Sequence, residues 1–286
     1  MNLPGESSLV PHRSRRARAS LAALGALAAL ALTPAAQAAD RWRPNPPASS
    51  FGAMFDNLFA LITLMIGVAF AIMLVVLLIP VVRDRARPGH KARFDHGNSL
   101  HDKRFTAVVS VAVFFILDAS VLVIAMQDLR EGFWNIPRPD TPNVLKVELL
   151  AQQWAWNFRT PGVDGKFGTP DDVVTINDLT VPEGQPVVIN EASKDVIHSF
   201  YIPDMRIKRD ANPGAINTIW FEPVKTGDFD ILCAELCGYA HYQMHGKLHV
   251  LPAAEYDTWL AEASRIAQAG YDESDTEARW AWEFKE

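Results

Sequence analysis

Cysteine is scarce in this chain: only two of its 286 residues are cysteines. So low a number excludes the dense disulfide framework that stabilises small secreted scaffolds. The sequence also lacks a C-x-x-C-H segment, the attachment motif of c-type haem. Both cysteines, Cys233 and Cys237, lie in one short segment, ILCAELCGYAHYQMHGKLHV. Any cysteine chemistry of the protein is therefore concentrated there.

Charged residues are missing from two long stretches in the first half of the chain. Residues 58–82 (LFALITLMIGVAFAIMLVVLLIPVV) contain none, and residues 106–126 (TAVVSVAVFFILDASVLVIAM) contain only Asp118. Each stretch is long enough to cross about 30 Å of hydrocarbon as a helix. The loop between them, residues 83–105, is basic and contains Arg83, Arg85, Arg87, Lys91, Arg93, Lys103 and Arg104. Because basic loops remain on the cytoplasmic side, we expect a transmembrane hairpin over residues 58–126 with both ends outside.

The N-terminal segment has the three parts of a secretory signal peptide. A basic stretch (residues 12–20) precedes an apolar stretch (residues 21–32), and AQA (residues 36–38) offers a cleavage site. The apolar stretch has about half of the ~20 residues that a membrane span needs. We therefore expect a signal peptide over residues 1–38 and a periplasmic segment over residues 39–57. The Arg15–Arg16 pair leaves twin-arginine export open beside the ordinary secretory route.

Basic residues are few in the last part of the chain. From residue 127 onward, 14 Lys and Arg stand against 26 Asp and Glu, a net formal charge of −12. Such a surface repels nucleic acid and attracts a basic protein. An acidic surface also keeps an exported domain soluble, so the charge alone does not identify a partner.

Short strand-like segments fill residues 127–253. They are rich in β-branched and aromatic residues and are separated by Gly, Pro and Asp, for example VLKVELLAQQWAWNFRT, VVTIND and DVIHSFYIP. This punctuation predicts an all-β sandwich or a small barrel. Beyond it, AAEYDTWLAEASRIAQAG has apolar residues at helical spacing and ends at Gly270. We expect a short helix and an acidic tail over residues 254–286.

The turn DGKFGTPDD contains three aspartates, Asp164, Asp171 and Asp172, whose hard oxygen atoms suit calcium. Their spacing is not that of an EF-hand loop, and no glutamate stands at the twelfth position. A solvated turn between strands therefore explains the segment better, with calcium binding as the alternative.

Three kinds of site fit the segment with both cysteines. A disulfide suits an exported protein, but so small a closed loop adds little stability and leaves His241 and Met244 unexplained. Zinc sites with two cysteines and two histidines rarely use methionine. Thiolate, imidazole and thioether together favour copper. One loop cannot surround a metal, so we expect His198 of DVIHSF as the second histidine, in preference to His245 and His249.

Residues 233–244, CAELCGYAHYQM, match C-x-E-x-C-G-x-x-H-x-x-M at every position. In this motif the chain resembles the cytochrome c oxidase subunit II family. The two membrane spans, WAW, DVIHSFYIP and DANPG occur in that family's order, and the resemblance covers residues 50–260. It implies a cupredoxin-like Greek-key sandwich with a binuclear copper centre, CuA. The implied ligands are the bridging thiolates of Cys233 and Cys237, the imidazoles of His198 and His241, the thioether of Met244 and the backbone carbonyl of Glu235.

The resemblance also implies a place where the electron arrives. In the family this is the first tryptophan of the WAW stretch, here Trp154, on the surface that meets cytochrome c. The family usually has tyrosine where this chain has Ala155. Alternation along a strand predicts Trp154 and Trp156 on one face, which argues against separate roles for them. The alternative is that both are ordinary core residues.

Several charged residues have implied partners outside the chain. The Glu235 side chain would meet a magnesium ion shared with subunit I, and Lys208 and Asp210 would face that subunit or pair at the surface. A charge such as Asp118 costs about 2.5–3.5 kcal/mol at the centre of a span, so we expect it to contact subunit I. Asp102 stands where the family often has a glutamate at the mouth of a proton channel, although the W-T-x-x-P pattern is absent there.

Three more residues, Asp195, Phe200 and Tyr242, are expected around the ligands, where such groups tune a redox potential. The predicted protein is the electron-accepting subunit of a terminal respiratory oxidase in a bacterial inner membrane, with its copper domain on the periplasmic side. It takes electrons from a c-type cytochrome and passes them through CuA to haem in subunit I, where O2 becomes water. No nucleic-acid partner is expected. The alternative is a structural or assembly module of a quinol-type oxidase, with a Cys233–Cys237 disulfide and no copper.

Overall fold

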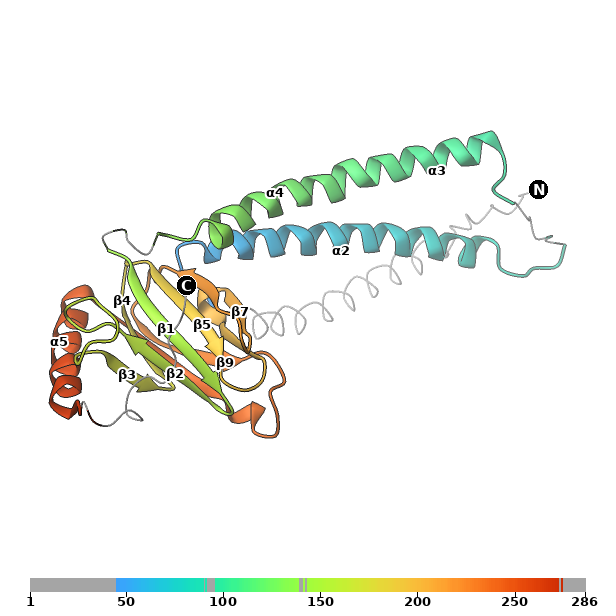
Figure 1. Ribbon diagram of the computed structural model, residues 1–286. Coiled ribbons are helices and arrows are strands. Elements are labelled where there is room, and N and C mark those ends of the chain that lie inside the picture. The colour runs from blue at the N-terminus through green and yellow to red at the C-terminus, as the bar shows by residue number, and fades with distance from the viewer. Residues whose placement is uncertain are drawn as a thin grey trace, which may run out of the picture. The chain divides into compact units, whose positions relative to one another are not determined.

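A computed structural model describes residues 45–89, 91, 96–138, 141, 143–272 and 274. The expected signal peptide, residues 1–38, and the end of the acidic tail, residues 275–286, lie outside these residues. The chain divides into two compact units, Met1–Asn45 and Pro46–Glu286. All described helices and strands belong to the second unit, where two long helices precede a β-sandwich (Figure 1).

Two long apolar helices open the described part of the chain. The first is α2 (Gly52–Arg83). The second consists of α3 (Leu100–Val113), the π-helical turn η1 (Phe114–Asp118), α4 (Ala119–Leu129) and the π-helical turn η2 (Arg130–Trp134). Both are long and apolar enough to span a membrane, and their apolar windows are 0% buried. The predicted helical hairpin is confirmed, because a core helix of a soluble domain would be covered along its apolar face.

A capping box begins the second helix. The Ser99 hydroxyl accepts a hydrogen bond from the Asp102 N–H (3.1 Å), and the Asp102 carboxylate accepts one from the Ser99 N–H (3.3 Å). Reciprocal bonds of this kind satisfy backbone N–H groups that a helix start leaves unpaired. Asp102, which the sequence suggested as the mouth of a proton channel, therefore stabilises the start of this helix.

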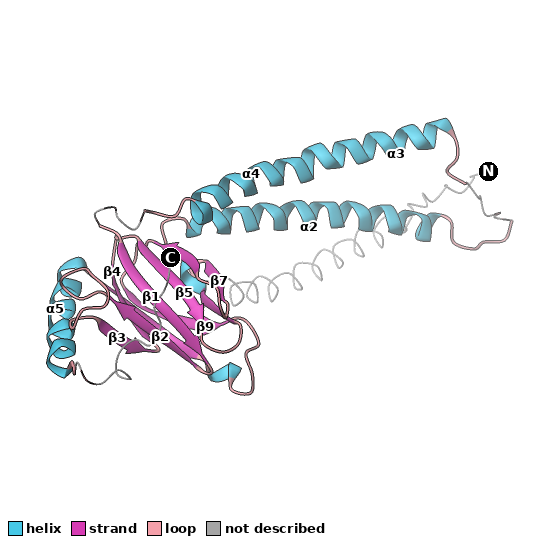
Figure 2. Ribbon diagram, in the orientation of Figure 1, coloured by secondary structure: helices cyan, strands magenta, loops and turns pink. Residues whose placement is uncertain are grey.

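The described residues contain ten strands in two five-stranded sheets, shown in magenta in Figure 2. The first sheet, in spatial order, contains β3 (Val173–Ile176), β2 (Ala155–Thr160), β1 (Leu145–Gln152), β5 (Val187–Ser193) and β8 (Asn217–Phe221). The second contains β4 (Asp178–Pro182), β10 (His245–Leu251), β9 (Gly227–Cys233), β6 (His198–Ile202) and β7 (Ile207–Ala211). Parallel pairing joins β1 to β5 and β10 to β4, and the other pairs are antiparallel. The predicted cupredoxin-like sandwich is confirmed.

The predicted C-terminal helix is confirmed as α5 (Ala253–Gly270). It packs against β3 and β4. Tyr256 is buried, and its ring centroid lies 5.6 Å from that of Trp259. We call the two sheets together with α5 the head.

Inward-facing side chains of both sheets form one core. On β2, Trp156 and Phe158 are fully buried while the residues between and beside them are half-buried, as period-two alternation predicts. The ring of Phe200 on β6 lies 5.5 Å from that of Trp156 and 6.1 Å from that of Phe158. Edge-to-face contacts of this kind add to ordinary apolar burial. These contacts pack β6, the strand that carries His198, against the core residues of β2.

Residues just before the first helix pack into the head. Ala48 is fully buried; its N–H donates to the Asp204 carbonyl (2.7 Å), and its carbonyl accepts from the Val224 N–H (2.7 Å). The Ser49 hydroxyl donates to the Met205 carbonyl (2.7 Å). Part of the segment that the sequence pattern set apart as residues 39–57 is therefore integral to the sandwich.

Candidate metal centre

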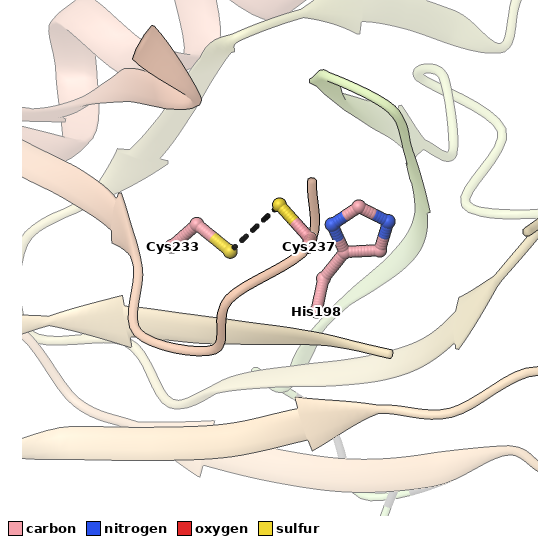
Figure 3. A group of neighbouring side chains, drawn as sticks. All are labelled: His198, Cys233 and Cys237. Carbon is pink, nitrogen blue, oxygen red and sulfur yellow. Dashed lines mark hydrogen bonds between the residues drawn. The ribbon is translucent and has the colours of Figure 1, made fainter. Parts of the chain in front are cut away.

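Three side chains with metal-binding atoms come together at one place in the sandwich (Figure 3). The ligand atoms of His198, Cys233 and Cys237 all lie within 4.8 Å of one another. His198 is the first residue of β6 and Cys233 is the last of β9, and these strands pair with Phe200 opposite Cys233. Sheet pairing therefore brings the histidine to the cysteines from a distant part of the sequence.

The two sulfur atoms face each other without a bond. Their Sγ atoms are 3.7 Å apart, whereas a disulfide holds them at about 2.05 Å. Both cysteines are free thiols, Cys237 buried and Cys233 half-buried. Two sulfur atoms that bind the same metal ion, each at about 2.3 Å, can adopt such a separation. The structure thus disfavours the alternative of a loop stapled by a disulfide.

The other three expected ligands lie beside this group. The Met244 Sδ is 3.1 Å from His198 Nδ1 and 3.7 Å from Cys237 Sγ. The His241 Nδ1 is 3.5 Å from Cys237 Sγ. The Glu235 carbonyl oxygen is 3.2 Å from Cys233 Sγ. The structure therefore brings together all six residues that the sequence pointed to, and their soft sulfur and imidazole donors fit copper.

A carboxylate orients His198. Its Nε2 lies 2.9 Å from Asp195 Oδ1, so Nδ1 is the nitrogen that faces the sulfur atoms. Burial opposes protonation of the imidazole, but hydrogen bonds with Cys233 and Asp195 outweigh it and raise the pKa of His198. Burial also acts to raise the pKa of Asp195, and hydrogen bonds from His198 and from the backbone at Gln153 and Val196 bring it below its ordinary value.

The two thiols ionise unequally. Burial opposes ionisation of Cys233, yet hydrogen bonds with His198 and with the backbone at Ser199 and Glu235 lower its pKa to about 6. Burial and the neighbouring Cys233 sulfur raise the pKa of Cys237 to about 12. At neutral pH the pair therefore carries about one negative charge, and a metal ion bound by both thiolates displaces the remaining proton.

Two residues that sequence reasoning missed tie the β1–β2 turn to the cysteine loop. The Gln153 Nε2 donates to the Cys237 carbonyl (2.8 Å), and the Gln153 N–H donates to Asp195 (2.7 Å). Gly238 permits this approach, because a Cβ there would lie 2.8 Å from Gln153 Nε2 and 3.3 Å from Trp154 Cζ2. Its φ of 124° also favours glycine. The sequence features that could have pointed to these two residues were the glycine directly after Cys237 and the glutamine before the first tryptophan.

Trp154 and Trp156 do not share a face, so the expectation from strand alternation was wrong. The strand β1 ends at Gln152 and β2 begins at Ala155, which leaves Trp154 in the turn. Trp154 is 36% exposed, whereas Trp156 is fully buried with its ring 6.1 Å from that of His198. A tight turn interrupts period-two alternation. The result is one outer tryptophan and one inner tryptophan.

The other histidines of the region lie outside this group. The His249 Nδ1 is 2.7 Å from an Asp228 oxygen, and its Nε2 is 3.4 Å from an Asp178 oxygen, so contacts with two aspartates account for it. His245 is exposed at the start of β10. Tyr242, suggested as a neighbour of the ligands, is 74% exposed.

A polar network lies next to His198 in sequence. The buried Ser199 hydroxyl donates to Asp210 Oδ1 (2.7 Å) and accepts from Lys208 Nζ (3.2 Å). Lys208 and Asp210 also approach each other at 3.4 Å. These bonds give both residues a partner within the chain, in agreement with the simpler alternative for them.

The aspartates of the DGKFGTPDD turn are engaged by the turn itself. The Lys166 N–H donates to Asp164 (2.8 Å), and the Gly168 N–H donates to Asp172 (2.7 Å). Arg159 also lies 3.7 Å from Asp172. These contacts are those of a hydrogen-bonded surface turn.

Fold and site together define a class: a membrane-anchored β-sandwich protein that gathers two thiols, two imidazoles and a thioether in one place. The family model for the periplasmic domain of cytochrome c oxidase subunit II matches residues 157–250. An alternative cytochrome c oxidase subunit 2 from Bradyrhizobium diazoefficiens is 34% identical over 250 residues, which cover 79% of this chain and 86% of that protein. The chain belongs to the cytochrome c oxidase subunit II family. It is accordingly a subunit of a haem–copper oxidase, an oxidoreductase complex.

Other matches cover shorter stretches. Cytochrome c oxidase subunit 2 from Thermostichus vulcanus is 33% identical over 154 residues, 53% of this chain and 44% of that protein. A crystal structure of the periplasmic domain of subunit II of cytochrome oxidase from Bradyrhizobium japonicum aligns with a TM-score of 0.40 and 27% identity, covering 46% of this chain and 98% of that one.

Proposed function

We propose that the chain accepts electrons at a binuclear copper centre, CuA, and passes them to haem in subunit I, where O2 is reduced to water. One observation carries the proposal: neighbouring donor atoms of six residues lie 3.1–3.7 Å apart at one place in a rigid sandwich. Soft sulfur with imidazole favours copper over zinc, calcium or magnesium. A mononuclear blue-copper site needs one cysteine, and the second cysteine favours a binuclear site.

Each residue has a distinct part in holding the metal. Cys233 and Cys237 would bridge two copper ions through their thiolates. His198 and His241 would each bind one ion through Nδ1, the atom that faces the sulfur group. Met244 would bind weakly through Sδ, and Glu235 through its backbone carbonyl. When bound, such a pair of copper ions takes up and gives off one electron with little change in geometry.

The chain's contribution is to hold these donors still. His198 and Cys233 stand at the ends of paired strands, which position side chains better than a free loop does. Asp195 fixes the His198 ring, and Gln153 fixes the loop through the Cys237 carbonyl. Buried Trp156 excludes water behind His198.

Trp154 is the proposed site at which the electron arrives, and a c-type cytochrome is the proposed donor. The ring is partly exposed and lies against Gly238, next to the ligand Cys237. The net charge of −12 from residue 127 onward favours a basic donor and faster encounter at low salt. Ala155 alters the surface beside this tryptophan without touching the ligand set.

Contacts with subunit I complete the proposal. The side chain of Glu235 is exposed and would share a magnesium ion with that subunit. Lys208 and Asp210 would face the same subunit while remaining paired to each other. We place the chain in a bacterial inner membrane, with a signal peptide over residues 1–38 and a cytoplasmic loop over residues 83–105. Residues 39–57, the copper domain (127–253) and the helix and tail (254–286) would be periplasmic.

Copper loading of the full-length chain in detergent, with its thiols reduced, tests the proposal. We expect about two coppers per chain, together with a near-infrared mixed-valence absorption. Cys237→Ser should lose both coppers together, because each bridging thiolate binds both ions. One copper per chain with a blue-protein spectrum would refute the binuclear centre.

A matched control and a thiol titration separate the alternatives. His245→Ala changes an exposed histidine outside the ligand group and should keep both coppers. Titration of the metal-free chain in its native redox state should find both thiols reactive. A chain with no reactive thiol and no copper uptake would instead favour the disulfide-bonded assembly module.

A further inference from the structure

Glu191 places a carboxyl group in the interior of the head. Its side chain is fully buried on β5, and neither carboxylate oxygen has a hydrogen-bond partner among the described residues. In the pairing of β5 with β1 it lies opposite Leu149, a core residue, so its side chain points between the two sheets. A buried carboxyl without a partner is costly to keep, and Glu191 is not one of the proposed copper ligands.

The second sheet contributes a guanidinium group to the same layer of the sandwich. Arg209 on β7 lies opposite Phe200, a core residue of β6, so its side chain leaves the inner face of that sheet. Its guanidinium carbon is 5.1 Å from the centre of the Phe133 ring, and it has no hydrogen bond or ion pair within the described part of the chain. Glu191 and Arg209 are thus complementary groups in one interior, and neither has a hydrogen-bonded partner there.

The layer that holds these two groups adjoins the metal-binding residues. Phe200 also lies opposite Cys233 of β9, so Cys233, Phe200 and Arg209 stand in a row across three neighbouring strands. At the usual spacing of strands, the backbones of Cys233 and Arg209 are about 10 Å apart. His198 is two residues from Phe200 along β6, about 7 Å away. Charges in a protein interior act over such distances with little screening, so the ionisation of Glu191 affects the free energy of adding an electron at the metal centre.

Few other charges act on Glu191. Burial raises the pKa of Glu191 most, Asp210 on the other face of β7 adds to the rise, and Arg209 opposes it. Its remaining neighbours in the layer are neutral: Leu149 of β1, Asn217 of β8, Phe158 of β2 and Phe200 of β6. The titratable groups near the layer are the metal-binding ones, His198, Cys233 and Cys237. Once these bind copper they no longer carry exchangeable protons, and Glu191 still can.

We infer that Glu191 is a redox-linked proton site of the head. Its carboxylate takes up one proton from solvent when the metal centre takes up one electron from the donor, and it releases that proton when the electron leaves for subunit I. The charge of the added electron is thereby balanced inside the head, and Arg209 stabilises the carboxylate while it is ionised. The inference rests on the proposed function for a metal centre that exchanges one electron.

The test uses the full-length chain in detergent. Glu191→Gln removes the proton site and Arg209→Met removes its counter-ion. Glu183→Gln and Arg265→Met, both on exposed residues, are the matched controls. Infrared spectra of the metal-free chain between about pH 5 and 10 follow the carbonyl band of the protonated carboxyl that Glu191→Gln lacks. Redox titration of the copper-loaded chain over the same range follows the midpoint potential.

We expect the equilibrium constant for reduction to fall about tenfold, or about 59 mV in midpoint potential, as the pH rises through the ionisation of Glu191. The reason is that the ionised carboxylate repels the added electron. In Glu191→Gln the potential should keep its low-pH value throughout. In metal-free Arg209→Met the infrared band should persist to a pH about one unit higher, because an opposite charge has been removed. Both controls should titrate as the unaltered chain does.

A change of less than twofold in the equilibrium constant across this range, or an equal pH dependence in Glu191→Gln, overturns the inference. An infrared band unaffected by Arg209→Met overturns the role of Arg209 as counter-ion. A chain that binds no copper overturns the proposed function and the redox link together, whereas the band of the metal-free chain shows by itself whether Glu191 binds and releases a proton.

Discussion

The hairpin and the head place their apolar side chains in opposite ways. Phe70 and Val123 in the helices face outward, whereas Leu149 and Phe158 in the sandwich are fully buried. The head therefore makes its own interior, and its fold depends on its own sequence. The hairpin has no such interior, so lipid and other proteins must complete its surface.

Polar groups follow the same division. In the head, buried His198 has Asp195, and buried Ser199 has Asp210. In the hairpin, Asp118 has no partner among the described residues. These buried groups of the head thus find their partners within the head, and Asp118 of the hairpin relies on its surroundings.

The largest expected effect is the pH dependence of copper binding by the head. Cys233 ionises near pH 6, but the pKa of Cys237 is about 12, so metal binding displaces the Cys237 proton across neutral pH. Because the pKa of His198 is raised, metal binding also displaces a proton from that imidazole at the lower pH values. Apparent copper affinity should therefore rise at least about tenfold per pH unit between pH 6.5 and 8. Competition titrations with a chelator at several pH values measure the slope. Equal affinities across that range would contradict a site formed by both thiolates.

Gly238→Ala tests how closely the head's loops must pack. The added Cβ would meet Gln153 Nε2 at 2.8 Å, on a backbone with φ of 124°. We expect destabilisation of about 1–3 kcal/mol, as for other strained backbone positions, and weaker copper retention against a chelator. Gly184→Ala serves as the control, since it also has positive φ (73°) but an added Cβ there meets nothing within 4 Å. Equal effects would mean that backbone strain alone, and not contact with Gln153, makes glycine necessary.

Glu191 is a buried carboxylic acid of the head without a partner, and the side chains of Trp156, Trp220, Tyr256 and Ser264 also bury polar atoms that have none among the described residues. Glu191 is fully buried on β5, and neither carboxylate oxygen has a hydrogen-bond partner among the described residues. Burial raises the pKa of Glu191 well above its ordinary value; Arg209 opposes that rise and Asp210 adds to it. The folded state therefore binds this proton more tightly than the unfolded state. Stability should fall as pH rises from about 4.3, the unfolded value, towards the folded pKa.

Glu191→Gln should remove this pH dependence and raise the free energy of unfolding at pH 8 by about 1–3 kcal/mol. Denaturant unfolding of the full chain in detergent, followed by tryptophan fluorescence at pH 5 and pH 8, measures the difference. Glu183→Gln, on an exposed residue, is the control and should leave the pH dependence intact. A steep fall in stability that persists in Glu191→Gln would assign the effect to another group.

The smallest expected effect lies in the hairpin. Ser99→Ala removes one side of the capping box and should destabilise the start of the second helix by about 0.5–1 kcal/mol. Faster amide hydrogen exchange at residues 100–103 reports this locally, while copper binding by the head stays unchanged. Asp102→Asn keeps an acceptor for the Ser99 N–H and should leave oxidase turnover, and any proton pumping measured with it, unchanged. A large loss of pumping in Asp102→Asn would restore the proton-channel role for this residue.

Local pattern in the sequence predicted the parts of the structure that depend on local chemistry. Uncharged length predicts the two helices, and strand-like segments between turn residues predict the sandwich. Donor chemistry calls for a second histidine beside the cysteines, and family resemblance supplies the full ligand set. His198 was predicted as a ligand because a single loop cannot surround a metal ion, so that a second histidine must come from another strand. The pairing of β6 with β9 brings His198 to the cysteines.

Features that depend on several distant segments could not be read from the pattern. Alternation assigned Trp154 to the same face as Trp156, because nothing in WAW shows that the strand stops at Gln152. Gln153 gained its importance from a hydrogen bond to a residue 84 positions away. Glu191 lies in a strand whose burial on both faces hides the period-two signal.

The place of Ala48 bears on how this protein is made. Its backbone bonds join it to carbonyl and amide groups of Asp204 and Val224, which are synthesised after both membrane helices. These bonds can form only when the residues before and after the hairpin lie on the same side of the membrane, which requires the chain between them to cross it an even number of times. The segment around Ala48 is also synthesised well before its partners, so it cannot form these bonds until they have been made. Both helices must therefore be inserted into the membrane before the head can complete its fold around Ala48.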